Sequence, residues 1–187
     1  MGRLSVFNQV TVDGYFADAG GDMSWAKASR DAEFDAFVAG NASGGGTLLF
    51  GRVTYEMMAA YWPTPFAAAD FPVVAARMNA MPKVVFSRTL ARADWNGTRL
   101  VADDLVGEVR RLKAGPDDIA VLGSGSLVVQ LAEAGLVDAF EIVVFPLVLG
   151  SGRTMFDGLN RRIHFRTTEV RRFRNGCILQ RYEPVAG

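Results

Sequence analysis

Hydrophobic positions along the chain alternate between short β-rich runs and stretches with helical spacing. Residues 3–10 form a β-rich run that ends near the turn dipeptide Asp13-Gly14, and apolar residues recur at helical spacing over 31–39. The continuous apolar runs at 47–50 and 119–122 are typical of strands buried on both faces. Strands that alternate with helices predict parallel pairing and an α/β fold.

The middle of the chain continues this alternation with one irregular stretch. A helix is expected from about Thr54 to Tyr61, and a strand is expected over 83–87. Between them, residues 62–82 hold four prolines among alanines and aromatic residues, which predicts a loop with a short helical insert. Two more apolar stripes at helical period predict helices over 105–112 and 127–131.

The last third of the chain is richer in β-formers. Residues 140–149 form one long run of β-formers, which we expect to lie at an apolar edge of the sheet. Two further runs, at 165–173 and 177–182, flank Asn175-Gly176. Asn-Gly between two such runs indicates a hairpin whose two central residues both take positive φ. The sheet should therefore finish in an antiparallel hairpin. No repeat or low-complexity linker divides the sequence, so we expect residues 1–187 to form a single domain.

Composition narrows the classes of function. Half of the residues are apolar, and 20 basic residues match 20 acidic ones, so no overall field would hold the chain to nucleic acid or an anionic membrane. Cys177 is the only cysteine and His164 the only histidine, which excludes a disulfide framework and a Cys/His zinc site within one chain, and we expect no metal. We expect neither a signal peptide nor a membrane span. The expected setting is the cytoplasm, with small molecules as partners.

Three strand-to-helix junctions carry residues suited to phosphate groups. In the first, Gly51-Arg52-Val53-Thr54, the glycine allows close approach, Arg52 could chelate a phosphate, and the Thr54 hydroxyl could donate a hydrogen bond. In the second, Gly123-Ser124-Gly125-Ser126, no bulky side chain keeps a pyrophosphate from the backbone. The same residues also suit structural roles, the first as a glycine-ended strand with a threonine cap and the second as a tight turn.

The third junction, Ser87-Arg88-Thr89, offers two hydroxyls and a guanidinium that could hold a monophosphate, and an ordinary polar turn explains it equally well. Each of the three junctions follows a predicted parallel strand, so all three should open at the same edge of the sheet. A dinucleotide with a pyrophosphate and an extra ribose phosphate would use two phosphate sites and favour arginine at the second.

Side chains for acid–base chemistry are scarce. His164 lies in a basic run near the final hairpin, and Cys177 has no histidine near it in sequence, so we expect neither to act in catalysis. Hydride transfer asks little of a protein beyond positioning, because the cofactor supplies the reactive group. The scarcity therefore suits a reductase.

Taken in order, these segments resemble the dihydrofolate reductase superfamily, and within it the small bacterial proteins similar to the riboflavin-biosynthesis reductase domain. The resemblance runs from the first strand to the last hairpin. It implies an eight-stranded, mostly parallel sheet flanked by helices, NADPH as cofactor, reduction of a pterin- or pyrimidine-like ring, and pairing into a homodimer. The landmarks that carry it are residues 12–17, Trp25, and residues 51–56, 83–90, 123–126 and 146–152.

By motif match, the resemblance also implies roles for individual residues. It assigns the adenosine end of NADPH and its 2′-phosphate to Arg52, Thr54, Ser87 and Arg88. It assigns the pyrophosphate to Gly123, Ser124, Gly125 and Ser126, and the nicotinamide to Gln9 and the Phe16 backbone, with Gly51, Val53 and Leu127 completing the cofactor set. The substrate would lie among Asp13, Trp25, Glu33, Phe34 and Pro146. One departure is that dihydrofolate reductases carry Gly-Gly where this chain has Gly123-Ser124.

The proton that accompanies the hydride needs a source, and an acid on the first helix or an ordered water has to deliver it. Asp31 is the expected catalytic acid, because it follows Trp25 closely in the sequence. Its alternative role is that of a carboxylate at a helix N-terminus.

Three functions stay open at this level. The first is an NADPH-dependent reductase of a small heterocyclic substrate of the pterin or pyrimidine type. The second is one of the known reactions, catalysed by 5-amino-6-(5-phosphoribosylamino)uracil reductase or by dihydrofolate reductase proper. The third is a non-catalytic protein that kept the nucleotide-binding cleft.

Overall fold

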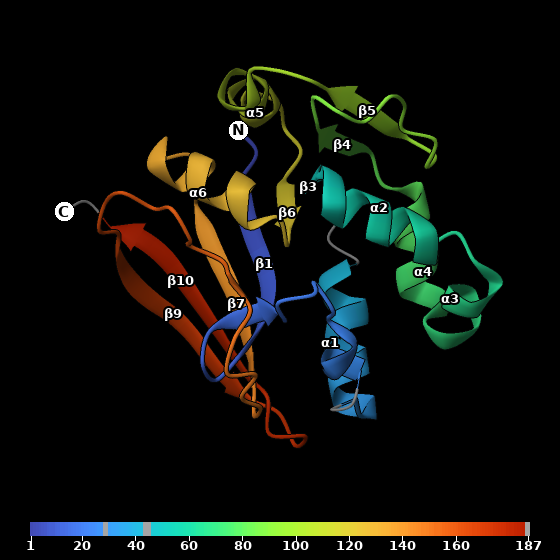
Figure 1. The fold of residues 1–187 in the computed structure, drawn as a ribbon, viewed down its shortest axis with the longest axis vertical. Coiled ribbons are helices and arrows are strands. Elements are labelled where there is room, and N and C mark those ends of the chain that lie inside the picture. Colours follow the sequence, from blue (N-terminus) through green and yellow to red (C-terminus); the bar gives the residue numbers. More distant parts are fainter. Residues whose placement is uncertain (28–29, 43–45, 186–187) are drawn as a thin grey trace.

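The computed structural model describes residues 1–27, 30–42 and 46–185. An eight-stranded sheet in the order β5-β4-β3-β6-β1-β7-β10-β9 forms its centre (Figure 1). The strands from β5 to β7 in this order are parallel, and β10 runs antiparallel to both β7 and β9. The predicted mostly parallel sheet with a C-terminal antiparallel hairpin is therefore confirmed. Its strands are β1 (Leu4–Thr11), β3 (Thr47–Gly51), β4 (Lys83–Phe86), β5 (Thr98–Val101), β6 (Ile119–Leu122), β7 (Ala139–Phe145), β9 (His164–Arg172) and β10 (Ile178–Val185).

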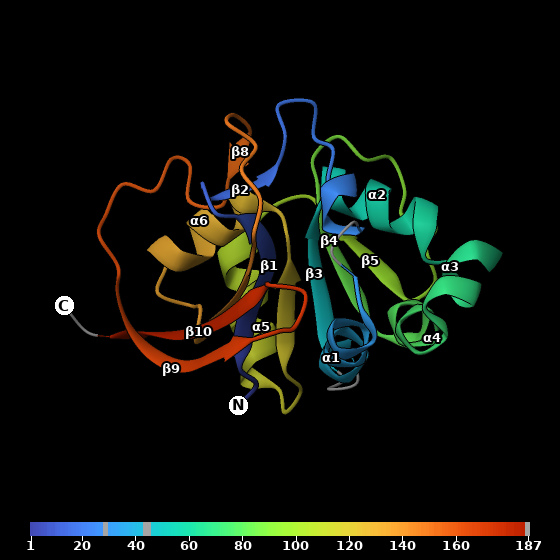
Figure 2. The same ribbon diagram turned by 90° about the horizontal axis from the view of Figure 1, so that it is seen from below.

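Helices cover both faces of this sheet (Figure 2). On one face lie α5 (Leu105–Ala114) and α6 (Gly125–Glu133), and on the other lie α1 (Ala32–Ala42), α2 (Arg52–Tyr61) and α4 (Pro72–Ala80). Within the described residues, no helix has both the length and the apolar composition needed to cross a membrane.

The apolar run of β3 shows how the sequence builds this layered core. Leu49 packs in the cluster under α5 and α6, whereas its neighbours Leu48 and Phe50 pack in the cluster under α2 and α4. All three are at most 3 % exposed. Because successive strand residues point to opposite faces, a strand with a helix layer on each side has to be apolar throughout.

A second, smaller sheet pairs β2 (Tyr15–Ala17) with β8 (Arg153–Thr154). Neither strand was predicted from the sequence, and β2 follows β1 directly after the Asp13-Gly14 turn. A 3₁₀ turn, η1 (Ser24–Lys27), lies between β2 and α1. This small sheet brings the segment after β1 next to the segment after β7.

The prediction of a loop over most of 62–82 was wrong, because α3 (Pro65–Asp70) and α4 fill this stretch. Pro65 and Pro72 stand in the first turns of the two helices, where a proline has no hydrogen bond to lose. The Thr64 hydroxyl accepts a hydrogen bond from the Ala67 N–H and so caps α3. These prolines therefore mark helix starts and not a loop.

Two expectations for the C-terminal third also need correction. The run predicted over 140–149 ends at Phe145 as β7, which lies inside the sheet between β1 and β10, so it does not form an edge. The edges are β5 and β9. In the hairpin turn only Gly176 takes positive φ, at 87°, and Asn175 does not. The Phe173 N–H bonds to the Cys177 carbonyl at 2.9 Å, which closes a loop of three residues in place of the expected two-residue turn.

A buried lysine fixes the connection between β4 and β5. Lys83 is 1 % exposed, and its ammonium group donates hydrogen bonds to the carbonyl oxygens of Asn79 (3.3 Å), Met81 (2.6 Å) and Asn96 (2.9 Å). The ammonium also lies 4.5 Å from the centre of the Trp95 ring. Burial lowers the pKa of Lys83 to about 8. These contacts tie the end of α4 to the segment that follows Ser87-Arg88-Thr89.

Candidate functional site

The three junctions predicted to bind phosphate lie at one edge of the sheet. β4 pairs with β3, and β3 pairs with β6, all in parallel, so the carboxyl ends of these strands leave the sheet side by side. Ser87 follows β4, Arg52 follows β3 and Gly123 follows β6. The expectation that the three loops share one edge is confirmed by this topology. The third loop was wrongly predicted to be a strand-to-helix junction, because β4 is followed by β5 and not by a helix.

A side-chain bridge joins the first two junctions. The Ser124 hydroxyl oxygen accepts a hydrogen bond from the Gly51 N–H at 2.8 Å, and the hydroxyl donates to the Thr54 hydroxyl oxygen at 2.9 Å. Ser124 takes a positive φ of 54°, and Gly123 takes one of 58°. An L-residue tolerates this conformation best when a short polar side chain can form local hydrogen bonds. The Ser124 side chain therefore joins two loops, which leaves the backbone N–H groups of this junction to meet a ligand.

The glycines of the second junction stand where a side chain would crowd its neighbours. A Cβ at Gly123 would lie 3.4 Å from the Thr54 side chain. A Cβ at Gly125 would lie 3.3 Å from the Thr154 carbonyl oxygen and 3.4 Å from the Phe16 ring. The fold thus brings Phe16, predicted near the nicotinamide, to the start of α6.

The first turns of α2 and α6 lack a capping side chain. Gly51 and Ser124 occupy the N-cap positions of these helices, and neither forms a side-chain cap. At α5, by contrast, the Asp104 carboxylate accepts a hydrogen bond from the Gly107 N–H at 2.9 Å. Uncapped N–H groups and the helix dipole both favour an anion at a helix start. The two starts at this edge could therefore hold two negatively charged groups.

Both arginines predicted to bind the 2′-phosphate are ion-paired. A terminal nitrogen of Arg52 lies 2.8 Å from the Glu56 carboxylate, and the Arg88 Nε lies 3.0 Å from the Asp103 carboxylate. The arginine side chains are 44 % and 80 % exposed, so both are accessible from solvent. Each pair engages one nitrogen of a guanidinium that carries five N–H donors.

Sequence reasoning missed both carboxylates. Glu56 stands four residues after Arg52 on α2, and this spacing was a readable signal for an ion pair. Asp103 gave no such signal, because it meets Arg88 only through the register of β4 and β5, in which Phe86 lies level with Val101.

Three other residues predicted to bind the cofactor are a turn residue, an exposed residue and a core residue, respectively. The Ser87 hydroxyl oxygen accepts hydrogen bonds from the N–H groups two and three residues on, which is the polar turn considered as its alternative. Val53 is 56 % exposed. Leu127 is buried in the core, and its N–H donates a hydrogen bond to the Ser124 carbonyl. Its N–H is therefore not available to a ligand.

On the face that carries α1, the start of that helix packs near the β9–β10 hairpin. The Asp31 carboxylate accepts a hydrogen bond from the Phe34 N–H at 2.8 Å, as a helix-start residue does. Phe34 is 3 % exposed and packs edge-on against Phe145 and Phe173. Burial raises the pKa of the Cys177 thiol to about 11, and the nearby Asp31 carboxylate adds to the rise. A protonated, buried thiol is a poor nucleophile.

Trp25 offers an unused hydrogen-bond donor on this face. Its ring packs against Phe145, with centroids 5.2 Å apart and planes at 81°. Its Nε1 is buried and meets no acceptor in the described part of the chain. A buried N–H without a partner costs free energy, which a ligand that accepts the hydrogen bond would recover. The Nδ2 of Asn8, beside Gln9 on β1, is likewise buried without a partner among the described residues, and no local pattern had marked this residue as part of a site.

The other residues predicted around the substrate form contacts within the protein. Asp13 accepts hydrogen bonds from the Thr11 hydroxyl and from the N–H groups of Leu149 and Gly150, and the Thr11 bond is the main cause of its lowered pKa. It therefore ties the loop after β1 to the loop after β7. A Cβ at Gly176 would lie 3.3 Å from the Pro146 ring, so this proline packs against the hairpin turn.

Glu33 links α1 to the hairpin. Its carboxylate accepts hydrogen bonds from the Arg174 backbone N–H at 3.0 Å and from the Arg171 guanidinium at 3.2 Å. These two contacts, the backbone one first, lower the pKa of Glu33. Both carboxylate oxygens are thus engaged in holding the hairpin.

A comparison with known protein families identifies the family of this chain. Residues 3–179 match the family described as the RibD C-terminal domain. The chain belongs to that family. The uncharacterized protein YyaP of Bacillus subtilis (strain 168) is 29 % identical to it over 177 residues, which cover 94 % of this chain and 92 % of YyaP.

Solved structures show the same fold. A putative riboflavin biosynthesis protein from Shewanella sp. PV-4 gives a TM-score of 0.75 at 22 % identity, covering 98 % of this chain and 99 % of its own. Dihydrofolate reductase from Enterococcus faecalis, complexed with NADP(H), gives a TM-score of 0.64 at 13 % identity, covering 97 % and 96 %. This RibD C-terminal domain therefore has the dihydrofolate reductase-like fold that its sequence resembles.

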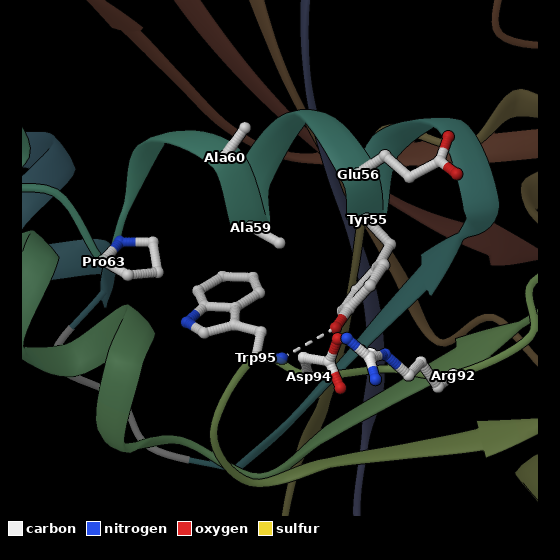
Figure 3. Close-up of a pocket in the computed structure, with 8 residues that line it drawn as sticks. All are labelled: Tyr55, Glu56, Ala59, Ala60, Pro63, Arg92, Asp94 and Trp95. Atoms are coloured by element: carbon white, nitrogen blue, oxygen red, sulfur yellow. Dashed lines mark hydrogen bonds and ion pairs between the residues drawn. The ribbon is translucent and has the colours of Figure 1, made fainter.

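Two surface cavities of this RibD C-terminal domain lie outside the three junctions. One, of about 410 Å³, opens between α2 and the β4–β5 connection, where the Tyr55 hydroxyl accepts a hydrogen bond from the Trp95 N–H (Figure 3). The other, of about 460 Å³, lies between α1 and the β9–β10 strands and includes Glu33 in its lining. No residue predicted to bind the cofactor lines either cavity.

Proposed function

We propose that this protein is an NADPH-dependent reductase of a small heterocyclic substrate of the pterin or pyrimidine type. The observation that carries the proposal is the pair of uncapped helix starts, of α2 and α6, which face one edge of the sheet beside Arg52 and Arg88. A dinucleotide with three phosphate groups is a ligand that uses such an arrangement in full. Membership of the RibD C-terminal domain family supports a reductase.

The residues at this edge fit the cofactor. The first-turn N–H groups of α6, at Gly125 and Ser126, would hold the pyrophosphate, and the absence of a Cβ at Gly125 lets the Thr154 carbonyl and the Phe16 ring pack close to this helix start. Arg52 and Arg88 would bind the 2′-phosphate. When bound, NADPH supplies the hydride.

On the substrate side, the chain would orient the ring and provide for the proton. The free Nε1 of Trp25 would donate a hydrogen bond to the substrate, and the packed rings of Phe34 and Phe145 would keep water from that side. Asp31, at the start of α1, would hold the proton that the reduced ring takes up. Its present hydrogen bond from Phe34 N–H occupies one carboxylate oxygen.

The proposal is tested by thermal-shift titration with NADPH, NADH and folate analogues, followed by an assay of NADPH oxidation with pterins and pyrimidines. NADPH should raise the melting temperature in a concentration-dependent manner. Binding without oxidation by any substrate of these classes would identify a nucleotide-binding protein that does not turn over. Tight binding of methotrexate would point to dihydrofolate reductase activity, and absence of any nucleotide effect would refute the proposal.

We propose further that the protein forms a homodimer. The expected apolar edge at 140–149 does not support this, since β7 lies inside the sheet. Exposed apolar side chains on the last two strands, Val170 at 64 % and Val185 at 42 % exposure, are ones that a dimer could cover, although the strand register separates them. A monomeric mass by light scattering at micromolar concentrations would refute the dimer.

A further inference from the structure

The carboxylate of Asp103 lies beside Arg88, which the family resemblance assigns to the 2′-phosphate end of NADPH. β4 and β5 are parallel neighbours, with Phe86 level with Val101 and the Ser87 N–H bonded to the Val101 carbonyl at 3.0 Å. Arg88 and Asp103 each follow two residues after this level pair, so the register itself brings their side chains together. The resulting contact, 3.0 Å from the Arg88 Nε to Asp103, is a consequence of the sheet and not of a local motif.

The same balance of charge holds at the first junction. Glu56 neutralises Arg52 across one turn of α2, as Asp103 neutralises Arg88 across two strands. The two positive charges expected to attract the 2′-phosphate are thus matched by two negative ones. All four side chains are at least 44 % exposed, so neither carboxylate is needed to compensate a buried arginine.

A phosphate group carries up to two negative charges at neutral pH, whereas a ribose hydroxyl carries none. A carboxylate beside the phosphate position repels the first and can accept a hydrogen bond from the second, as acidic residues do in NAD sites. Exposed ion pairs are weak, so the arginines remain able to engage a phosphate. The carboxylates therefore reduce the difference in affinity between NADPH, which carries the 2′-phosphate, and NADH, which carries a 2′-hydroxyl.

We propose that Asp103 is a specificity-determining residue that lowers the preference of this protein for NADPH over NADH. This rests on the proposed function, because it assumes that a nicotinamide dinucleotide binds at this edge. Asp104, its neighbour, has a separate task, since its carboxylate caps α5 through the Gly107 N–H. Asp103 has no such structural duty in α5, and its charge can be removed without uncapping the helix.

The Arg92–Asp94 pair provides a matched control. It lies on the same β4–β5 connection, with 2.8 Å between its charged atoms, and its side chains are 83 % and 68 % exposed, close to the 80 % and 74 % of Arg88 and Asp103. Asp94→Asn therefore removes a similarly exposed carboxylate from a similarly exposed arginine. The control pair lines the cavity that Glu56 also lines, but neither of its residues belongs to the three junctions. Any effect of net charge alone would appear in both variants.

The experiment is isothermal titration of NADPH and NADH into the wild type, Asp103→Asn and Asp94→Asn at low and high ionic strength. Asp103→Asn should raise the ratio of NADPH to NADH affinity by about three- to fivefold at low ionic strength, the size of an exposed charge pair, and by less at high salt. Asp94→Asn should leave the ratio unchanged.

An unchanged or lowered ratio in Asp103→Asn, with both nucleotides still bound, would overturn this inference and leave the proposed function standing. An equal rise in both variants would also overturn it, because the effect would then be one of overall charge. If neither nucleotide binds the wild type, the proposed function fails and the inference fails with it. A circular dichroism spectrum and a melting curve for each variant ensure that folded protein is compared.

Discussion

The Ser124 hydroxyl oxygen lies 2.8 Å from the Gly51 nitrogen, and this hydrogen bond joins two loops that are 73 residues apart in the chain. The same hydroxyl donates to Thr54, so one side chain fixes the spacing between the starts of α2 and α6. If both helix starts hold phosphate groups of one dinucleotide, this bridge sets the distance at which they do so.

Removal of this bridge should lower the stability of the protein. Ser124→Ala leaves the Gly51 N–H without its acceptor, and we expect the free energy of unfolding to fall by about 1–3 kcal/mol. Ser124→Gly loses the same bridge but relieves the positive φ of 54°, so it should be less destabilising than alanine by about 1 kcal/mol. Urea unfolding measures both values. Equal losses in the two variants would show that the backbone conformation costs nothing here.

Arg52 should matter more for NADPH than for the fold. Arg52→Ala removes charge-assisted hydrogen bonds to the 2′-phosphate, and we expect NADPH binding to weaken by about 1.5–3 kcal/mol. Its pair with Glu56 is exposed, so the melting temperature should change little. Arg92→Ala, which breaks another exposed pair, is the control. An unchanged dissociation constant for NADPH would leave Arg52 with only a structural role.

Asp31 has two roles that substitution can separate. Asparagine also accepts hydrogen bonds at a helix start, so Asp31→Asn should preserve the contact with the Phe34 N–H and leave the melting temperature and NADPH affinity nearly unchanged. Asp31→Ala should lower the free energy of unfolding by about 1 kcal/mol. We expect both variants to reduce turnover at least tenfold, on the order of 1.4 kcal/mol in the barrier. Turnover that persists in Asp31→Asn would mean that solvent supplies the proton.

Two buried groups should give the stability opposite dependences on pH. Burial lowers the pKa of Lys83 from 10.5 to about 8, so between these values the unfolded chain binds more protons and stability rises with pH. Burial raises the pKa of Cys177 from 9.0 to about 11, so its contribution is present below pH 9 and is lost towards pH 11.

Urea unfolding at roughly pH 7.5, 8.5 and 9.5 measures how the free energy of unfolding changes across the range in which Lys83 titrates. In Cys177→Ala the rise attributed to Lys83 should stand alone, and in Lys83→Met it should disappear. A Lys83→Met variant that keeps the rise would show that another group causes it.

The order of strands and helices was largely predictable because apolar spacing reports burial directly. Leu48, Leu49 and Phe50 had to be apolar once helices covered both faces of β3. The prolines at 65 and 72 misled the prediction, since the same residue that breaks a helix interior also favours a helix start.

The candidate site was predictable where its parts are local and was not where they meet across the sheet. Glycines and arginines after strands marked the three junctions. The bridge from Ser124 to Gly51 and the pair of Arg88 with Asp103 depend on strand order and register, which no local pattern encodes. Glu33 was expected at the substrate because of its place on the first helix, but the partner that engages it, the β9–β10 hairpin, is 138 residues away.

The edge strand β9 has a consequence for the protein in concentrated solution. Nearly every residue of this strand is exposed, and its outer backbone groups could accept another strand. Three of its side chains, Arg166, Arg171 and Arg172, carry positive charge. A further strand that added here would have to desolvate these guanidinium groups, so the edge resists the growth of ordered aggregates.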